Sequence, residues 1–279
     1  MKINNFKDWL RDENRNTLIM GILNVTPDSF SDGGEYYNSQ KAVDCALQME
    51  RDGADIIDIG GESTRPGASP ISIEEELNRV LPVIRGIRQK SNIAISIDSY
   101  KSEVAEKAIA VGANIINDIS GLRFDKNMIH LTKEFQVPII IMHMLGSPQN
   151  MQNNPSYSDL MEELISFFKE RVNSLINSGI LKNNIIIDPG IGFGKTVDHN
   201  YLIIRELKRI AGLGYPVLIG PSRKSFIGHT LNLPTEERIE GTAAAITSAI
   251  MNGSRIVRVH DVKEMFRVVK VAEQICGIA

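Results

Sequence analysis

Eight short apolar runs along the chain each stop at a polar or charged residue, and helical patterns lie between them. Parallel strands separated by helices can close into a barrel. Their carboxyl ends then lie on one rim, where the catalytic groups of such barrels gather. The pattern therefore predicts both a fold and the place of its active site. In chain order the stops are Asn24, Glu62, Asp98, Asn117, His143, Asp188, Ser222 to Lys224, and His260.

The apolar runs have the composition of strands that are buried on both faces. Ile and Val dominate them, which is typical of parallel sheets covered by helices. We expect strands at residues 17–23, 54–60, 93–98, 113–118, 137–142, 184–188, 216–220 and 254–259. We expect helices at residues 39–52, 73–90, 101–111, 125–135, 156–178, 199–211, 236–252 and 262–276.

Strict alternation of strands and helices leaves two α/β architectures, the TIM (β/α)8 barrel and the doubly wound open sheet. Eight units in about 260 residues favour the barrel, which needs about 250. An open sheet would more often carry a glycine-rich phosphate turn after its first strand, whereas here that strand runs into NVTPDSFSDGG. No linker or low-complexity tract interrupts the pattern, so we expect one domain over residues 1–279.

Composition and charge exclude several classes of protein. The chain is 42% hydrophobic, has a net charge of -3, and lacks a long basic cluster, which argues against nucleic acid as a partner. No apolar run approaches the roughly 20 residues that span a bilayer. The segment MKINNFKDWLRDENRN has no signal-peptide core, so we expect a cytoplasmic protein. Cys45 and Cys276 are expected to be free, mostly buried thiols.

Two loops, residues 24–38 and 60–72, stand out by length and content. Both follow early strands, both are rich in Gly, Ser, Thr and Pro, and both contain charges. Loops on this rim are where functional groups of barrels are found. We therefore expect both loops to take part in the site, the alternative being that they are only long surface turns.

Four of the rim residues suit a flat heterocycle. Asp98, Asn117, Asp188 and Lys224 offer two carboxylates, an amide and an ammonium group. A carboxylate accepts paired N–H bonds from an amidine-like group, and a lysine donates to a ring carbonyl. The alternative is a set of structural ion pairs, such as Asp188 with Lys224. Four polar residues at four strand ends favour the binding site, because buried polar groups are costly without partners.

A second set of residues suits phosphate. Arg258 and His260 end the last strand and share one face of it, and Thr64 and Arg65 lie in the second long loop. An arginine, an imidazole, a hydroxyl and backbone N–H groups are typical phosphate ligands, and barrels often hold phosphate near their last strands. Asn24 could add a neutral oxygen for Mg²⁺, which takes few protein ligands when substrate phosphates supply the rest. By itself, such an Asn is more often a turn residue.

The segment PGIGFGKT at residues 189–196 looks like a phosphate-binding loop but does not fit one. The first glycine of a P-loop would stand at Pro189, and the third glycine of a dinucleotide-binding motif would stand at Lys195. We interpret its glycines as a tight turn that brings backbone close to a ligand. His143 is a weak candidate for a ligand contact, and no His/Cys spacing suggests zinc.

Five segments resemble one known family. MGILNVTPDSFSDGG (20–34) and GADIIDIGGESTRPGA (53–68) are similar to the two signature segments of the dihydropteroate synthases. DPGIGFGK (188–195), GPSRKSFIG (220–228) and RVHDV (258–262) are similar to later blocks of that family. The resemblance covers nearly the whole chain and most closely matches the single-function bacterial form.

The resemblance implies a TIM barrel, usually a homodimer, that condenses 6-hydroxymethyl-7,8-dihydropterin diphosphate with 4-aminobenzoate in folate biosynthesis. By resemblance, the pterin-binding residues would be Asp98, Asn117, Met142, Asp188 and Lys224. The diphosphate end would meet Thr64, Arg258 and His260, with Mg²⁺ on Asn24. The aminobenzoate pocket, in which sulfonamides compete, would be shaped by Arg65, Pro66, Phe193 and Ser225.

The chemistry of the residues agrees with that reaction. Departure of diphosphate leaves a methylene cation delocalised into the pterin. Mg²⁺, Arg258 and His260 would stabilise the leaving charge, Asp98 the cation, and Lys224 would hold the pterin. No side-chain nucleophile is needed, and the sequence carries no Ser/His/Asp or Cys/His signature. Two alternatives stay open: a pterin methyltransferase domain with a corrinoid partner, and a catalytically silent pterin-binding paralogue.

Overall fold

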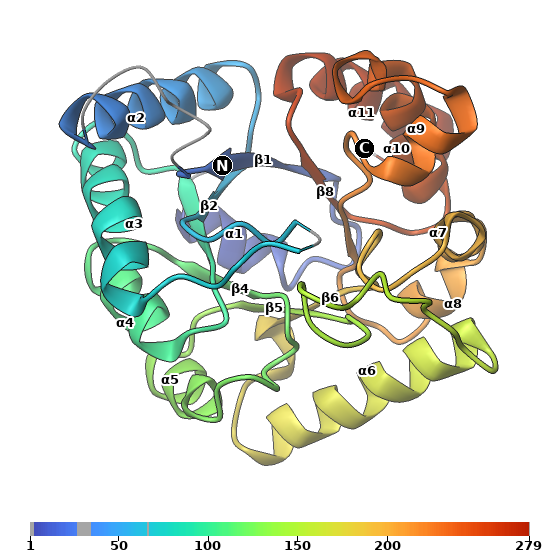
Figure 1. Cartoon of the computed structure of the whole chain (residues 1–279), viewed down its shortest axis with the longest axis horizontal. Coiled ribbons are helices and arrows are strands. Elements are labelled where there is room, and N and C mark those ends of the chain that lie inside the picture. The colour runs from blue at the N-terminus through green and yellow to red at the C-terminus, as the bar shows by residue number, and fades with distance from the viewer. Residues whose placement is uncertain (1–2, 27–34, 66, 279) are drawn as a thin grey trace.

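The computed structural model describes residues 3–26, 35–65 and 67–278, and within them eight parallel strands form one sheet (Figure 1). Strands β1 to β6 pair in sequence order, β7 pairs with β8, and β8 pairs with β1. A parallel bridge between Ile187 and Val217 joins β6 to β7 and closes the ring. The expected TIM barrel is therefore confirmed. The strands are β1 (Leu18–Asn24), β2 (Ile56–Gly60), β3 (Ala94–Asp98), β4 (Ile115–Asp118), β5 (Ile139–Met142), β6 (Ile185–Asp188), β7 (Leu218–Ile219) and β8 (Ile256–Val259).

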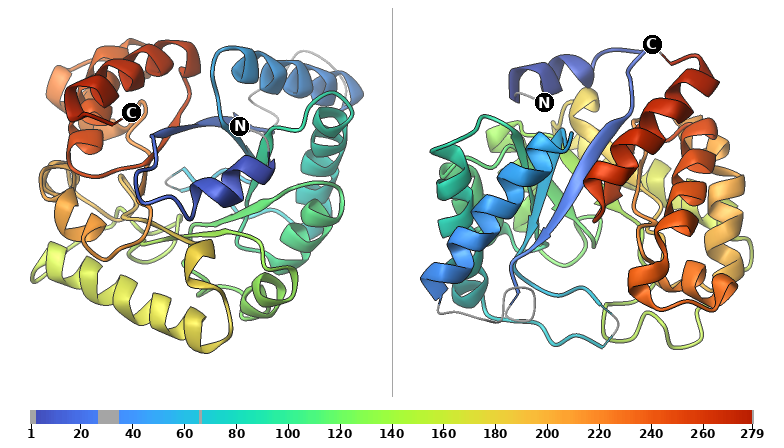
Figure 2. Two further views of the ribbon diagram at one scale, coloured as in Figure 1. Left: turned by 180° about the vertical axis from the view of Figure 1, so that it is seen from behind. Right: turned by 90° about the horizontal axis from the view of Figure 1, so that it is seen from above.

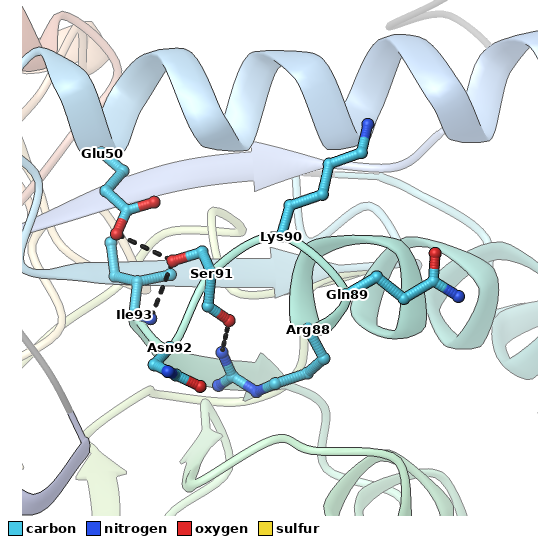
Figure 3. Close-up of a pocket in the computed structure, with 7 residues that line it drawn as sticks. All are labelled: Glu50, Arg88, Gln89, Lys90, Ser91, Asn92 and Ile93. Atoms are coloured by element: carbon cyan, nitrogen blue, oxygen red, sulfur yellow. Dashed lines mark hydrogen bonds between the residues drawn. The ribbon is translucent and has the colours of Figure 1, made fainter.

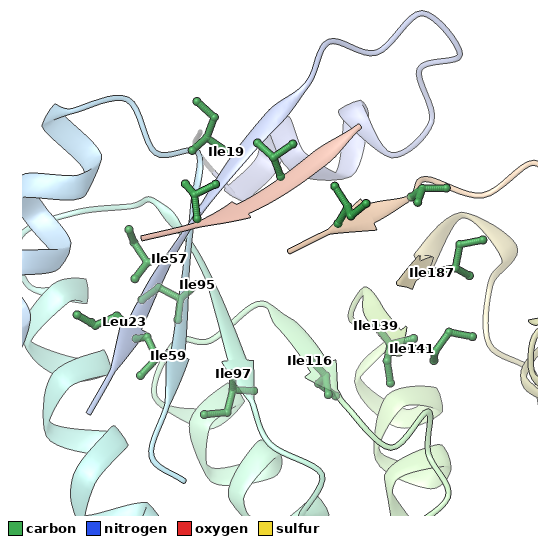
Figure 4. Close-up of a cluster of buried hydrophobic side chains, with 14 of the residues drawn as sticks. Ile19, Leu23, Ile57, Ile59, Ile95, Ile97, Ile116, Ile139, Ile141 and Ile187 are labelled. Carbon is green, nitrogen blue, oxygen red and sulfur yellow. The ribbon is translucent and has the colours of Figure 1, made fainter. Parts of the chain in front are cut away.

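A ring of helices surrounds the barrel (Figure 1). Apolar residues on the outward face of the strands, such as Ile57, Ile95 and Ile141, pack against these helices in the largest buried cluster (Figure 4). The helices are α2 (Glu35–Arg51), α3 (Ile73–Arg88), α4 (Ser102–Ala110), α5 (Asn127–Phe135), α6 (Leu160–Asn177), α7 (Val197–Arg205), α8 (Leu207–Ala211), α9 (Ser225–Leu231), α10 (Ile239–Met251) and α11 (Val262–Cys276).

A further helix, α1 (Ile3–Trp9), lies across the amino-terminal end of the barrel (Figure 2). Phe6 and Trp9 on α1, with Leu10 just after it, are buried against the inward-facing residues at the bottom of the strands. The loops that follow the strands extend from the opposite end (Figure 2). One end of the barrel is thus filled with apolar side chains, and the other is left for the loops that carry chemistry.

The helices differ from expectation in three places. The helix expected at 199–211 is two helices, because the chain bends at Glu206, after which Leu207 and Ile210 are both buried. Helix α9 was not expected, and neither was α1, whose few apolar residues stand in a polar segment. Within the described residues no helix is long and apolar enough to cross a membrane. Cys45 and Cys276 are free and half-buried.

Candidate active site

Alternation along the strands gives the barrel interior an apolar layer with a polar layer above it. Residues two apart in a strand point to the same face. The inward-facing apolar layer includes Ile56, Ala94, Ile115, Ile140, Ile186 and Ile256. Two residues further along the same strands stand Asp58, Ser96, Asn117, Met142, Asp188 and Arg258. The strand order therefore collects these side chains just inside the carboxyl-terminal rim.

One guanidinium group joins two carboxylates in this layer. Arg258 donates from Nε to Asp58 Oδ2 at 2.6 Å and from Nη2 to Asp98 Oδ2 at 2.8 Å. Asn117 donates from Nδ2 to the same Asp58 oxygen at 3.1 Å. Asp58 is fully buried, and the Arg258 side chain is 19% exposed. Asp58, which was not predicted from the sequence, thus binds two predicted residues, Asn117 and Arg258. Arg258 binds the third predicted residue, Asp98.

Asp58 is the residue that the sequence reasoning missed. The polar end of the second strand was assigned to Glu62, which instead lies beyond the barrel, where it binds Lys101 and Tyr100. Asp58 stands inside the apolar run IIDIG, two residues after the inward-facing Ile56. A carboxylate at an inward position of a buried strand was the signal that could have revealed it.

The electrostatics of this cluster set Asp98 apart. Burial, and then the charge of Asp58, raises the pKa of Asp98 to about 7, although Arg258 works to lower it. Burial tends to lower the pKa of Arg258, but the charges of Asp58 and Asp98 raise it by more, so the net shift is upward. Oδ1 of Asp58 and Oδ1 of Asp98 are buried without a hydrogen-bond partner among the described residues. Two carboxylate oxygens in the polar layer therefore lack a hydrogen-bond donor from the described residues.

Asp188 is held by the turn that follows it. Its Oδ1 accepts the Gly190 N–H at 2.7 Å, and burial raises the pKa of the carboxyl group to about 6. Gly190 has a φ of +70°, and a Cβ there would lie 2.1 Å from the His143 carbonyl oxygen. The turn is therefore as tight as predicted and needs glycine at this position.

Lys224 approaches the same region from the loop before α9. The preceding Arg223 has a φ of +56°, a conformation held by a hydrogen bond from Nε to Asp261 Oδ2 at 2.9 Å and by Arg238 Nη1, which donates to the Arg223 carbonyl at 3.0 Å. Lys224 Nζ lies 4.3 Å from the centre of the Phe193 ring. Burial, and then Arg258, lowers its pKa to about 8.

Structural ion pairing does not account for Asp188 and Lys224. Across the described ranges no ion pair joins these two side chains. Arg258 instead pairs with Asp58 and Asp98. The ammonium group of Lys224 and the carboxylate of Asp188 both remain close to the polar layer, where a ligand could contact them.

The end of β8 presents a neutral imidazole. The backbone N–H of His260 donates to Ser222 Oγ at 3.1 Å, and this hydroxyl lies 3.0 Å from His260 Nδ1. Since Oγ already accepts one bond, its own hydrogen can go to Nδ1, which leaves Nε2–H as a donor. Burial, and then Arg258, lowers the His260 pKa to about 4, so the ring is uncharged at neutral pH.

Asn24 ends β1, half-buried, next to Gly60 at the end of β2. Its Oδ1 lies 3.8 Å from where a Gly60 Cβ would stand, and so the amide oxygen faces the strand end. No group of three or more His, Cys, Asp or Glu residues suitable for a metal occurs in the described part of the chain. Asn24 offers one neutral oxygen at this strand end, which is a ligand type that Mg²⁺ accepts when phosphates supply the rest.

The remaining predicted residues lie around this polar layer. Met142 and Phe193 belong to one small buried apolar cluster. Thr64 is half-buried, and Arg65 and Ser225 are exposed at the rim. Pro66, and most of the first long loop, lie outside the described residues. Gly67 N donates to the Pro148 carbonyl at 3.1 Å, which places the second long loop against the segment after β5.

A polar pocket also exists at the opposite end of the barrel, between the ends of α2 and α3 (Figure 3). Its groups bind one another: Ser91 Oγ donates to Glu50 Oε1 at 2.8 Å, and Arg88 Nη1 donates to the Ser91 carbonyl at 3.2 Å. Arg88 Nε also donates to the Gly112 carbonyl at 2.8 Å. These contacts fasten helix ends to the sheet, so the polar groups of this pocket already have partners within the protein.

Comparisons with known proteins agree on one family. The family model described as pterin binding enzyme matches residues 20–260. The dihydropteroate synthase of Synechocystis sp. is 48% identical over 265 residues, which is 95% of this chain and 92% of that protein.

Solved structures give the same result. The dihydropteroate synthase of Clostridium difficile, crystallised in the presence of pteroic acid, is 45% identical with a TM-score of 0.89, covering 95% of this chain and 98% of the other. The dihydropteroate synthase of Xanthomonas albilineans with 4-aminobenzoic acid is 40% identical with a TM-score of 0.88, covering 94% of each chain.

Proposed function

The chain belongs to the pterin-binding enzyme family as a dihydropteroate synthase, and we propose that its barrel condenses 6-hydroxymethyl-7,8-dihydropterin diphosphate with 4-aminobenzoate to give 7,8-dihydropteroate and diphosphate. The observation that carries this proposal is the polar layer inside the rim. There, unpaired oxygens of Asp58 and Asp98 lie beside a half-buried arginine and a neutral histidine. Acceptors for a heterocycle thus adjoin donors for an anion.

The pterin ring would lie over the polar layer. Asp188, Asp98 and Asn117 supply acceptors for its N–H groups, and the Lys224 ammonium group supplies a donor for its carbonyl. Met142 would line the apolar side of the ring, since it is buried beside Phe193. Removal of a buried acceptor leaves the donors of the ligand unpaired, which is why these contacts would select a pterin over other flat rings.

The diphosphate would lie toward β8 and the second long loop. Arg258 and the Nε2–H of His260 would donate to its oxygens, together with Thr64. Asn24 would be the protein ligand of Mg²⁺, which, when bound, would neutralise part of the diphosphate charge. Two of the five N–H donors of Arg258 bind Asp58 and Asp98, so the other three could donate to the diphosphate.

The aminobenzoate would enter from the outer side, against Phe193. Arg65 and Ser225 are exposed at the rim, where a carboxylate could reach them, and Pro66 would complete the pocket. Lys224 lies over the Phe193 ring and so stands between this pocket and the pterin site. In this arrangement the arylamine nitrogen would lie beside the carbon that it must attack.

The reaction needs positioning and electrostatics. The bond between the pterin methylene carbon and the diphosphate oxygen breaks, and the electron pair leaves with the oxygen. Arg258 and His260 would stabilise that oxygen while Asp98 stabilises the cation, and Lys224 would hold the pterin carbonyl. The arylamine nitrogen then forms the new bond to the methylene carbon and loses a proton to the departing diphosphate or to water. No covalent enzyme intermediate is required.

Assembly and location belong to the same proposal. We expect a cytoplasmic protein of one domain over residues 1–279, which acts as a homodimer. Helices α10 and α11 expose Met251, Val271 and Ile275, of which 51%, 61% and 63% of the surface is accessible. A second copy would cover this apolar face. Light scattering should give twice the 31.0 kDa chain mass, and Ile275→Glu should shift it toward the monomer, whereas an unchanged mass of one chain would contradict the dimer.

The decisive experiment measures diphosphate release. We expect release to require both substrates and Mg²⁺, and to stop when the metal is chelated. Asp188→Ala should abolish binding of the pterin diphosphate in calorimetry, while the exposed Asp198→Ala on α7 should bind like the wild type. Binding without release would favour a silent pterin-binding protein, and no binding at all would contradict the proposed site.

A further inference from the structure

Lys195 and His143 form a buried pair that the proposed reaction does not use. The structure places Lys195, 3% exposed, beneath the turn after β6, and His143, 7% exposed, directly after β5. Lys195 Nζ donates to the Phe193 carbonyl at 3.0 Å and to the His143 carbonyl at 3.3 Å, and it lies 3.2 Å from His143 Nδ1. One ammonium group therefore ties together two loops from neighbouring strands.

We propose that Lys195 is a positioning residue for the aminobenzoate pocket. Through its bonds to the Phe193 and His143 carbonyls it would fix the Phe193 ring relative to the rest of the barrel. This inference rests on the proposed synthase function and extends it to a residue that touches no substrate. Phe193 in turn lies against Lys224, which stands between the aminobenzoate pocket and the pterin site.

Neighbouring contacts make the position of Lys195 specific. The two loops touch so closely that a Cβ on Gly194 would stand 2.8 Å from the Leu145 side chain. Tyr157 hydroxyl donates to the Gly194 carbonyl at 2.7 Å, and Gln152 Nε2 donates to the Gly192 carbonyl at 2.6 Å. The carbonyl groups on either side of Phe193 thus have neutral donors, and the Phe193 carbonyl itself has the ammonium group.

The pairing also fixes the state of the imidazole. Burial, and then the charge of Lys195, lowers the His143 pKa to about 2, so the ring stays neutral. Since Lys195 donates to Nδ1, the ring hydrogen must stand on Nε2. Burial lowers the Lys195 pKa to about 7, with the charge of Asp188 acting against that decrease. Nδ1 of His143 therefore accepts a hydrogen bond from Lys195 inside the protein and is not available to a ligand.

Lys195→Met tests this role, since Met keeps the chain length and removes the donor. We expect the KM for 4-aminobenzoate to rise by about 10- to 100-fold, because a small displacement of a side chain that positions the substrate, here Phe193, can cost that much. The Kd of the pterin diphosphate in calorimetry should change by less than about threefold, because Asp98, Asn117 and Asp188 stay in place. Lys208→Met, an exposed lysine on α8, is the matched control and should leave both constants unchanged.

Nuclear magnetic resonance gives a readout that does not depend on activity. At about pH 6, where Lys195 is charged, His143 should be a neutral ring protonated on Nε2, and Lys195→Met should lose this single tautomer. An unchanged aminobenzoate KM in Lys195→Met, or equal losses for both substrates, would overturn the proposal. If Lys195→Met does not fold, Lys195→Gln replaces it, since its shorter, neutral side chain cannot donate to all three acceptors, and an unchanged aminobenzoate KM would again overturn the proposal. A wild-type enzyme without synthase activity would instead contradict the proposed function, while the tautomer of His143 would still test the pairing.

Discussion

At the scale of single residues, the protonation of the site depends on one cation, Arg258, that Asp58 and Asp98 share. Asp58 and Asp98 both bind Arg258, and one guanidinium group cannot fully compensate two buried carboxylates. Together with burial, this raises the pKa of Asp98 to about 7. Lys224 holds its own proton less firmly than usual, with a pKa of about 8. Asp98 and Lys224, two of the groups that would contact the pterin, thus titrate close to neutral pH.

We expect kcat/KM for the pterin diphosphate to be bell-shaped in pH. Asp98 stabilises a cation only when ionised, so the value should rise with pH through about 7. Lys224 donates as an ammonium group, so it should fall again above about 8. Asp58→Asn removes the charge that raises the Asp98 pKa and should move the acid limb to lower pH, with a loss of about 10-fold in rate from the loosened Arg258.

Lys224→Arg provides the control for that assignment. Arginine stays charged at all these pH values, and so only the alkaline limb should move upward. The pH profiles of wild type, Asp58→Asn and Lys224→Arg decide the matter together. An acid limb that stays in place in Asp58→Asn would show that Asp98 does not produce it.

The sequence predicted the residues of the site better than their partners. Asp98, Asn117, Asp188 and Arg258 could be found because each follows or ends an apolar run, and strand ends meet on one rim. Asp58 could not be found by that rule, because it stands inside a strand. Its role depends on Arg258, which lies 200 residues away in the chain and is brought near only by the pairing of β1 with β2 and β8.

At the scale of elements, buried charges hold together the two ends of the second long loop, near Glu62 and Ile71. Lys101 Nζ, at the start of α4, donates to Glu62 at 2.6 Å, Glu76 at 2.7 Å and the Ile71 carbonyl at 2.8 Å. Ile71 N also donates to Glu62 at 3.0 Å. Burial works to lower the Lys101 pKa, but its bonds to the two glutamates raise it more. The two ends of the segment that carries Thr64 are therefore held in one place.

We expect Lys101→Met to destabilise the protein by about 3 kcal/mol, because it leaves two buried carboxylates without their cation. The same change should increase hydrogen exchange in residues 63–71. Lys107→Met on the same helix is a matched control, since Lys107 pairs with Glu103 on the surface, where such a pair is worth roughly 0.5 kcal/mol or less. Urea unfolding measures both. Equal changes in the free energy of unfolding in the two variants would mean that Lys101 does not hold the two ends of this loop together.

The elements themselves were largely predictable, with errors where local signals are weak. All eight strands were expected, because long Ile and Val runs are strong signals. Strand β7 is shorter than its apolar run suggests, at Leu218–Ile219. The bend at Glu206 was missed because the apolar spacing continues across it. Helix α9 was missed because it follows directly from the loop that carries Lys224, where glycine, proline and serine indicate a turn.

At the scale of the whole molecule, the barrel separates stability from chemistry. Unpaired oxygens of Asp58 and Asp98 lie at the carboxyl-terminal rim, and α1 covers the other end with Phe6, Trp9 and Leu10. Phe6 and Trp9 stack with ring centres 5.7 Å apart, and Trp9 Nε1 donates to the Asn16 carbonyl at 2.9 Å. A change at the closed end should therefore alter folding without altering the reaction.

Phe6→Ala is the variant that tests this separation. Loss of a buried phenylalanine should cost roughly 3 kcal/mol, which for a chain of this size lowers Tm by about 6–12 °C. Because Trp9 is the one tryptophan in the sequence, its emission should shift to the red as its stacking partner is lost. Diphosphate release at 25 °C should stay within about twofold of wild type, since no rim residue moves. Phe135→Ala at the end of α5, where the ring is already 40% exposed, should lower Tm by much less. Loss of activity in Phe6→Ala without unfolding would show that the two ends of the barrel are coupled.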